Sequence, residues 1–190
     1  MGTTQWIVLA IIGVIVIYAI MVYNGLVLVK NAVSKAWANI DVLLKQRHDE
    51  LPKLVETCKQ YKQFEAETLE KVTTARARVQ SAREQTNVGA LGPAEGALRS
   101  AVNGIFATVE AYPELKANEN FIQLQNRITS LENAISDRRE LYNDSVYINN
   151  VRIETFPDLI IARIAAFGPA KLLEFDSAEI TDVDLKKIFA

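Results

Sequence analysis

The stretch from Trp6 to Val29 contains no charged residue, and it constrains the fold more than any other feature of the 190-residue chain. As an unbroken helix rising about 1.5 Å per residue, it would be about 36 Å long. That length is enough to cross a hydrocarbon core of about 30 Å with some tilt. We therefore predict a transmembrane helix over residues 6–29, preceded by a short outer terminus over residues 1–5.

The residues around this span predict its orientation. The first five residues, MGTTQ, include no lysine or arginine, and a cleaved signal peptide needs a basic start, so we expect an uncleaved anchor. Basic residues follow the span within about 15–20 residues, which by the positive-inside rule places the following chain in the cytoplasm. Near the inner leaflet, Lys30 and Lys35 are expected to add about 1 kcal/mol each of attraction to anionic lipids.

Small or polar residues near the inner end of the span let two membrane helices approach closely, as at Asn24 and Gly25. The residues predicted to lie in the membrane span include Trp6, Gly13, Tyr18, Tyr23 and Asn24.

Charge and cysteine content argue against a nucleic-acid-binding protein and against a disulfide-stabilised protein. The 23 acidic and 21 basic residues give a net charge of −2, which does not favour nucleic-acid binding. The single cysteine, Cys58, excludes an intramolecular disulfide framework and fits a reducing compartment. Because Cys58 lies on an apolar helix face with Leu54 and Val55, we expect a buried, unreactive thiol.

Apolar residues recur every three or four positions after the span, which predicts helices throughout. The first of these patterns, from Val33 to Leu44, predicts that the membrane helix continues as a stem. Another pattern begins at Leu51 and ends at the glycine- and proline-containing sequence NVGALGP, residues 87–93, where we expect a loop. Further breaks are expected at YPE, residues 112–114, and at FPD, residues 156–158.

The helix predicted after residue 120 has the heptad spacing of a coiled-coil seam. Its seam residues are Phe121, Leu124, Ile128, Leu131, Ile135, Arg138 and Tyr142. Arg138 on this seam indicates either a solvated end or a buried ion pair.

We therefore expect an all-α protein: an N-terminal transmembrane helix that continues into an antiparallel four-helix bundle with long helices, over residues 30–155. Residues 156–190 are expected to form a short apolar helix, LIIARIAAF, and an acidic C-terminal tail. Burying that apolar helix requires another surface.

The segment LLKQRHDELPKLVE, residues 43–56, holds the only histidine. His48 with Asp49 resembles a metal or acid–base site, but a zinc or iron site needs three or four convergent ligands and neighbouring helix residues do not face one another. Capping explains the segment better: Asp49 suits a helix N-cap, Pro52 a first turn, and Arg47 the last turn of the preceding helix. We predict a helix corner at Arg47, His48, Asp49 and Pro52.

Other candidate chemistry is weak. A di-iron bundle needs paired Glu-x-x-His motifs, which one histidine cannot supply, and no glycine-rich phosphate loop is visible. Arg76 and Arg83 share one helix face, which we interpret as solvated in preference to an anion site. We expect no catalytic residue, no metal and no cofactor. The residues expected to contact a partner or a second copy are Trp37, Tyr112, Arg138, Tyr142, Phe156, Leu159 and Phe167.

Several motifs in order resemble the LemA family of bacterial membrane-anchored helical proteins. They are YNGLV from Tyr23, AWANIDVLLKQRHDELPKLVETCKQY from Ala36, AYPELKA from Ala111, YNDSV from Tyr142, and FP at Phe156. The chain departs from the family pattern at Glu50, where an apolar residue is usual, at Cys58, where valine is usual, and at Asn149, where tyrosine is common.

The resemblance implies a single-pass protein of the bacterial inner membrane, with its N-terminus outside, a cytoplasmic helical bundle and no established enzymatic activity. It also implies an association with forming or organising internal membranes. We expect a non-enzymatic scaffold that binds membrane lipids and self-associates. The alternative is a membrane-tethered adaptor for another membrane protein, such as a protease or an envelope-stress component.

Overall fold

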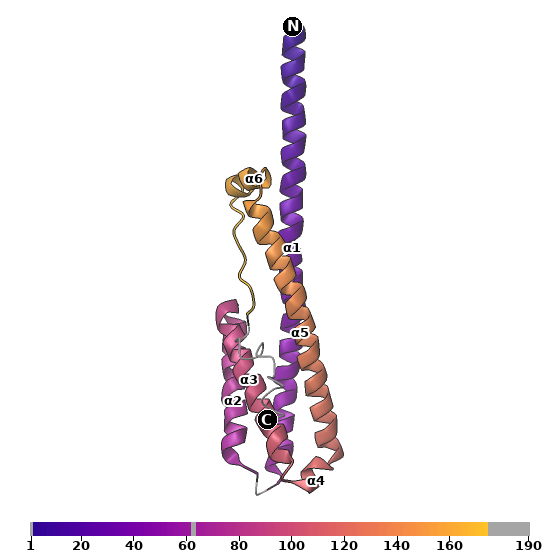
Figure 1. Cartoon of the computed structure of the whole chain (residues 1–190), viewed down its shortest axis with the longest axis vertical. Helices are drawn as coiled ribbons and strands as arrows, with labels where there is room; N and C mark the ends of the chain where they lie inside the picture. The colour runs from indigo at the N-terminus through magenta and orange to yellow at the C-terminus, as the bar shows by residue number, and fades with distance from the viewer. Residues whose placement is uncertain (1, 62–63, 175–190) are drawn as a thin grey trace, which may run out of the picture. The chain divides into compact units, whose positions relative to one another are not determined.

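Figure 1 shows the computed structural model of the chain, which describes residues 2–61 and 64–174. Within these residues every regular element is a helix, which confirms the predicted all-helical class. The helices are α1 (Thr3–Lys59), α2 (Ala66–Glu84), α3 (Val88–Val109), α4 (Pro113–Lys116), α5 (Glu119–Glu154) and α6 (Asp158–Ile164). The predicted acidic tail lies outside the described residues from residue 175 onward.

Helix α1 contains the predicted apolar span. It is long and apolar enough to cross a membrane, with a mean hydropathy of 2.7 over its most apolar stretch, and that stretch is 6% buried within the chain. Since leaving so many apolar side chains in water is unfavourable, this surface needs an apolar environment that the described residues do not provide.

The chain forms two compact units. The first unit contains α1 up to Asn39 together with Glu140–Lys171. The second unit contains Ile40–Arg139 and the chain from Leu172 onward. Helices α1 and α5 therefore each contribute residues to both units.

The predicted corner at Asp49 is wrong, because α1 continues without interruption to Lys59. Pro52 lies inside the helix and lacks the N–H that would bond to the His48 carbonyl four residues earlier. In the second unit, Arg76 of α2 supplies the missing donor, with its Nε 3.0 Å from the His48 oxygen. The helix therefore tolerates Pro52 because a neighbouring helix satisfies the carbonyl that Pro52 leaves free.

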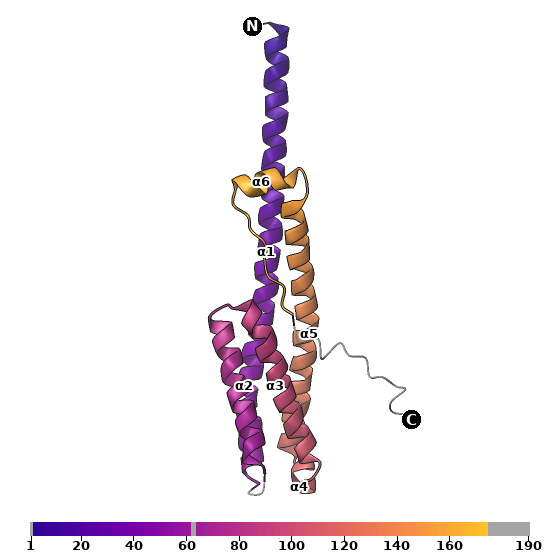
Figure 2. The same cartoon turned by 60° about the vertical axis from the view of Figure 1, so that its left-hand side comes forward.

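Helices α2 and α3 lie side by side and pack through their apolar faces (Figures 1 and 2). The connection between them is Gln85–Asn87, shorter than the predicted loop over residues 87–93. The Asn87 side chain accepts a hydrogen bond from the Ala90 N–H and caps α3, while Gly89 and Pro93 are exposed within the helix. The expected loop was wrong because this cap begins the helix before the glycine and proline.

The other predicted breaks are confirmed. Tyr112 precedes the short helix α4, and Phe156 and Pro157 separate α5 from α6. On α5, the seam residues Phe121, Ile128, Leu131, Ile135 and Tyr142 are buried. Arg138 is exposed, so it marks a solvated end of the seam and not a buried ion pair.

We expect Arg76→Ala to lower the free energy of unfolding by about 1–3 kcal/mol, because the His48 carbonyl would lose its donor. In a Pro52→Ala background the same substitution should cost less, because the restored backbone N–H at position 52 bonds to that carbonyl. Chemical denaturation in detergent, followed by circular dichroism, measures both costs. An equal cost in the two backgrounds would show that Arg76 does not compensate for Pro52.

Candidate functional site

The first unit buries the C-terminal end of the apolar span. Val22 and Leu26, one turn apart on α1, form a core cluster with Ile153 of α5 and Ala162 of α6. Two partly buried residues, Ile161 and Phe167, pack against this cluster. Figure 2 shows α6 and the end of α5 beside α1. Part of the LIIARIAAF segment therefore packs directly against the span.

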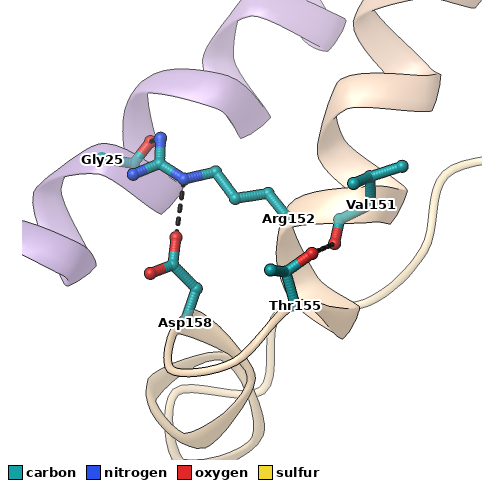
Figure 3. Close-up of polar contacts among 5 residues, drawn as sticks. All are labelled: Gly25, Val151, Arg152, Thr155 and Asp158. Carbon is teal, nitrogen blue, oxygen red and sulfur yellow. Dashed lines mark hydrogen bonds and ion pairs between the residues drawn. The ribbon is translucent and has the colours of Figure 1, made fainter.

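Arg152 of α5 joins three segments of this unit (Figure 3). Its Nε donates to Asp158 Oδ2 at 2.7 Å, in the first turn of α6. Its Nη1 donates to the Gly25 carbonyl of α1 at 3.0 Å. A Cβ at position 25 would collide with this guanidinium, so a larger residue there would displace it from its present position. Sequence reasoning identified Gly25 as a place of close helix approach but missed Arg152.

An extended segment, residues 167–171, follows α6 and is bound to α5. Asn150 pairs with Ala170 twice: its Nδ2 donates to the Ala170 carbonyl and its Oδ1 accepts from the Ala170 N–H, both at 2.9 Å. The Tyr142 hydroxyl donates to the Lys171 carbonyl at 2.9 Å. Buried Asn149, a position where the chain departs from the family pattern, donates to the Gly168 carbonyl at 3.4 Å. These side chains satisfy backbone groups that have no partner in a sheet or helix.

Aromatic contacts in this unit involve three of the predicted contact residues, Trp37, Tyr142 and Phe167. Trp37 packs on Tyr142 with ring centroids 5.7 Å apart. Tyr23 meets Phe167 edge to face at 5.8 Å, and Lys30 Nζ lies 5.7 Å from the centroid of the Phe167 ring. Trp37 and Tyr142 are therefore internal contacts of the unit.

The remaining predicted residues take no part in these aromatic contacts of the first unit. Phe156 and Lys35 are exposed and Leu159 is partly buried. Tyr112 belongs to the second unit, where its ring packs 5.5 Å from that of Phe64. The predicted span residues Trp6, Tyr18, Tyr23 and Asn24 are exposed. Gly13, also predicted, has open space around its Cα.

The second unit contains a buried ion pair that sequence reasoning missed. Arg47, predicted to end a helix, instead pairs with Glu95 of α3, and their side chains are 4% and 3% exposed. Burial raises the pKa of the Glu95 carboxyl, and the Arg47 guanidinium opposes that shift. Glu95 follows Leu91 and precedes Leu98 on the apolar face of α3, a pattern that could have identified it as buried.

A cavity of about 30 Å³ lies beside this pair and is lined also by Arg99, Glu132 and Arg139. Its volume suits one water molecule. Among the described residues, no group of three or more His, Cys, Asp or Glu side chains could hold a metal ion. The pair therefore has the character of a structural ion pair.

Arg76 and Arg83 were expected on a solvated face, but both have partners in the second unit. Arg83 Nε lies 3.1 Å from Asp41 Oδ1. Arg76 Nη2 lies 2.6 Å from His48 Nε2, and because a guanidinium only donates, Nε2 accepts and the ring is neutral. Burial, and then Arg76, lower the pKa of His48.

Cys58 is fully buried, as predicted, and burial raises the pKa of its thiol to about 12. A thiol with so high a pKa stays protonated at neutral pH and is a poor nucleophile.

The lowered pKa of His48 predicts that stability falls as the pH drops below about 6.5, because the unfolded chain then binds a proton that the folded chain resists. His48→Gln retains an acceptor for Arg76 and cannot gain that proton. The denaturation midpoint should therefore change less between about pH 7.5 and about pH 5.5 in the variant than in the wild-type protein. The same difference in both proteins would contradict this role of His48.

We expect Gly25→Ala to displace the Arg152 guanidinium and loosen α6, because the added Cβ occupies its position. Hydrogen exchange in detergent should become faster across residues 158–164. Gly13→Ala is the matched control in the same helix, since a Cβ there meets no atom within 4 Å. Unchanged exchange of α6 in Gly25→Ala would mean that Arg152 does not hold it.

Comparison with known proteins finds a family match over most of the chain. The model of the LemA family matches residues 36–186. Protein LemA of Metamycoplasma hominis is 28% identical over 166 residues, which are 87% of this chain and 74% of that protein.

Two further relatives match a shorter part. Magnetosome protein MamQ 2 of Paramagnetospirillum magneticum and magnetosome protein MamQ of Magnetospirillum gryphiswaldense are each 27% identical over 100 residues. Those residues are 53% of this chain and 37% of each relative. Because the family model covers most of the chain, this protein belongs to the LemA family.

Proposed function

We propose that this protein is a non-enzymatic, membrane-anchored helical scaffold that self-associates and organises the membrane in which it lies. The observation that carries the proposal is the apolar stretch of α1, which is almost entirely exposed and continues in one helix into residues packed against α5 and α6. The anchor is thus rigidly joined to the first unit, so an assembly of these units fixes the positions of their anchors in the bilayer.

The orientation follows from the charges. Lys30 and Lys35 are exposed just after the span, whereas the residues before it include no basic side chain. By the positive-inside rule, the N-terminus lies outside and the remaining chain lies in the cytoplasm of a bacterial cell. In this proposal the four long helices form an antiparallel bundle.

Self-association is supported by an apolar row on α5 in the first unit. Leu141, Ile148 and Val151 are exposed and are spaced by seven and three residues, which places them on one helix face. An apolar helix face of this kind is typically covered by another helix, and a second copy presents the same row. The magnetosome proteins among the relatives are consistent with a membrane-associated protein.

The second candidate is an adaptor for another membrane protein. Exposed Phe156, just before α6, and exposed Ile164, the last residue of α6, favour it, because a partner helix could cover them. This candidate predicts that removing residues 156–190 abolishes binding of one specific partner and leaves self-association intact.

We expect the full chain in detergent to form a homo-oligomer at micromolar concentration, as measured by size exclusion with light scattering. Ile148→Glu should shift it toward monomer, because a charge at a buried interface is unfavourable. Ile122→Glu is the matched control, since Ile122 is an exposed isoleucine of α5 in the second unit.

A wild-type monomer at these concentrations would contradict the scaffold. Equal dissociation by both variants would show that the row on α5 is not the interface.

A further inference from the structure

We propose that α6 and the preceding Phe156 lie in the inner leaflet at the boundary between headgroups and hydrocarbon, with Phe156, Ile160 and Ile164 among the lipid chains. This inference rests on the proposed function of α1 as a membrane anchor. It assigns the exposed face of α6 to lipid, whereas the adaptor candidate assigns that face to a protein.

The position of α6 along α1 sets its depth. Its core contacts are Val22 and Leu26. From Trp6 to Leu26 a helix rises about 30 Å, the thickness of the hydrocarbon core. Tryptophan favours the membrane interface, so with Trp6 at the outer interface, Leu26 reaches the inner one. Whatever packs beside Leu26 then lies at the inner boundary of the hydrocarbon.

The face of α6 that points away from its core is apolar. Ile161 and Ala162 face the cluster with α1, whereas Ile160 and Ile164, one turn apart, are 50% and 78% exposed. Phe156, just before the helix, is 76% exposed. An apolar surface this exposed would be unfavourable in water but is favourable among lipid chains.

The charges near α6 also suit this depth. Of the two charged residues in the helix, Asp158 is paired with Arg152, so its charge is neutralised where the dielectric constant is low. Arg163 is exposed in the last turn. An arginine side chain is long enough to bring its guanidinium to lipid phosphates while its alkyl part stays among the chains. Lys30 is likewise exposed close to the cluster and can reach the same phosphates.

Lipid is the occupant that the structure favours because α6 is short and already fixed to the anchor. A seven-residue helix cannot hold itself at a membrane, but α1 keeps it at the surface, so it inserts without a separate cost of recruitment. Arg152 fixes the helix through both Gly25 of α1 and Asp158 of α6. The exposed isoleucines are therefore held at one depth.

Depth-dependent fluorescence quenching tests the proposal on the full chain, reconstituted in vesicles of phosphatidylethanolamine and phosphatidylglycerol. Three separate variants each carry one environment-sensitive dye on an introduced cysteine. The substitutions are Ile164→Cys in α6, Val14→Cys in the span and Ile122→Cys in the second unit. All three native side chains are exposed, and the buried Cys58 can stay because its pKa of about 12 keeps it unreactive. Iodide quenches from water, and doxyl groups near the lipid headgroup quench from the membrane.

The expected result is that position 164 is quenched by the shallow doxyl lipid and is several-fold less sensitive to iodide than position 122. Quenching of position 164 by iodide, with position 14 protected, would overturn the inference but leave the anchor intact. Protection of position 164 from both quenchers would mean that protein covers α6 and would also overturn it. Iodide quenching at position 14 would instead contradict the proposed anchor.

Discussion

The guanidinium of Arg152 is the interaction on which the first unit depends. It binds the Gly25 carbonyl of α1 and the Asp158 carboxylate of α6 from its own place on α5, so it joins residues separated by 127 positions in the sequence. Glycine at position 25 leaves the space that this guanidinium occupies, and a Cβ there would displace it. The apolar cluster around Leu26 packs beside these contacts, and hydrogen bonds that involve a charged group are stronger than those between neutral groups.

The same principle, a side chain that satisfies a backbone group, recurs in both units. Arg76 donates to the His48 carbonyl that Pro52 leaves without a helical partner. Asn150 pairs with both backbone groups of Ala170 in the extended segment. In each case a backbone group that would be costly to leave unsatisfied is matched by a side chain from another helix. These contacts maintain a long helix and an extended segment without any β-sheet in the described residues.

Much of the fold could be predicted from the sequence, but the candidate site could not. The span, the break at Tyr112 and the separation of α6 followed from apolar periodicity and proline, which act locally. The corner at Asp49 was wrong because Arg76, which binds the His48 carbonyl that Pro52 leaves free, lies 28 residues from His48 in the sequence. Arg152 was missed for the same reason: nothing near it in the sequence indicates that its partners are on α1 and α6.

The proposed function requires that α1 crosses the bilayer and joins an assembly of helical units at its inner surface. Electron cryo-microscopy of the chain reconstituted in lipid tests this most directly. We predict density for α1 through the bilayer in several copies around one assembly, with α6 at the headgroups of the leaflet nearest Leu26. Single copies, or an α1 lying outside the bilayer, would contradict the account.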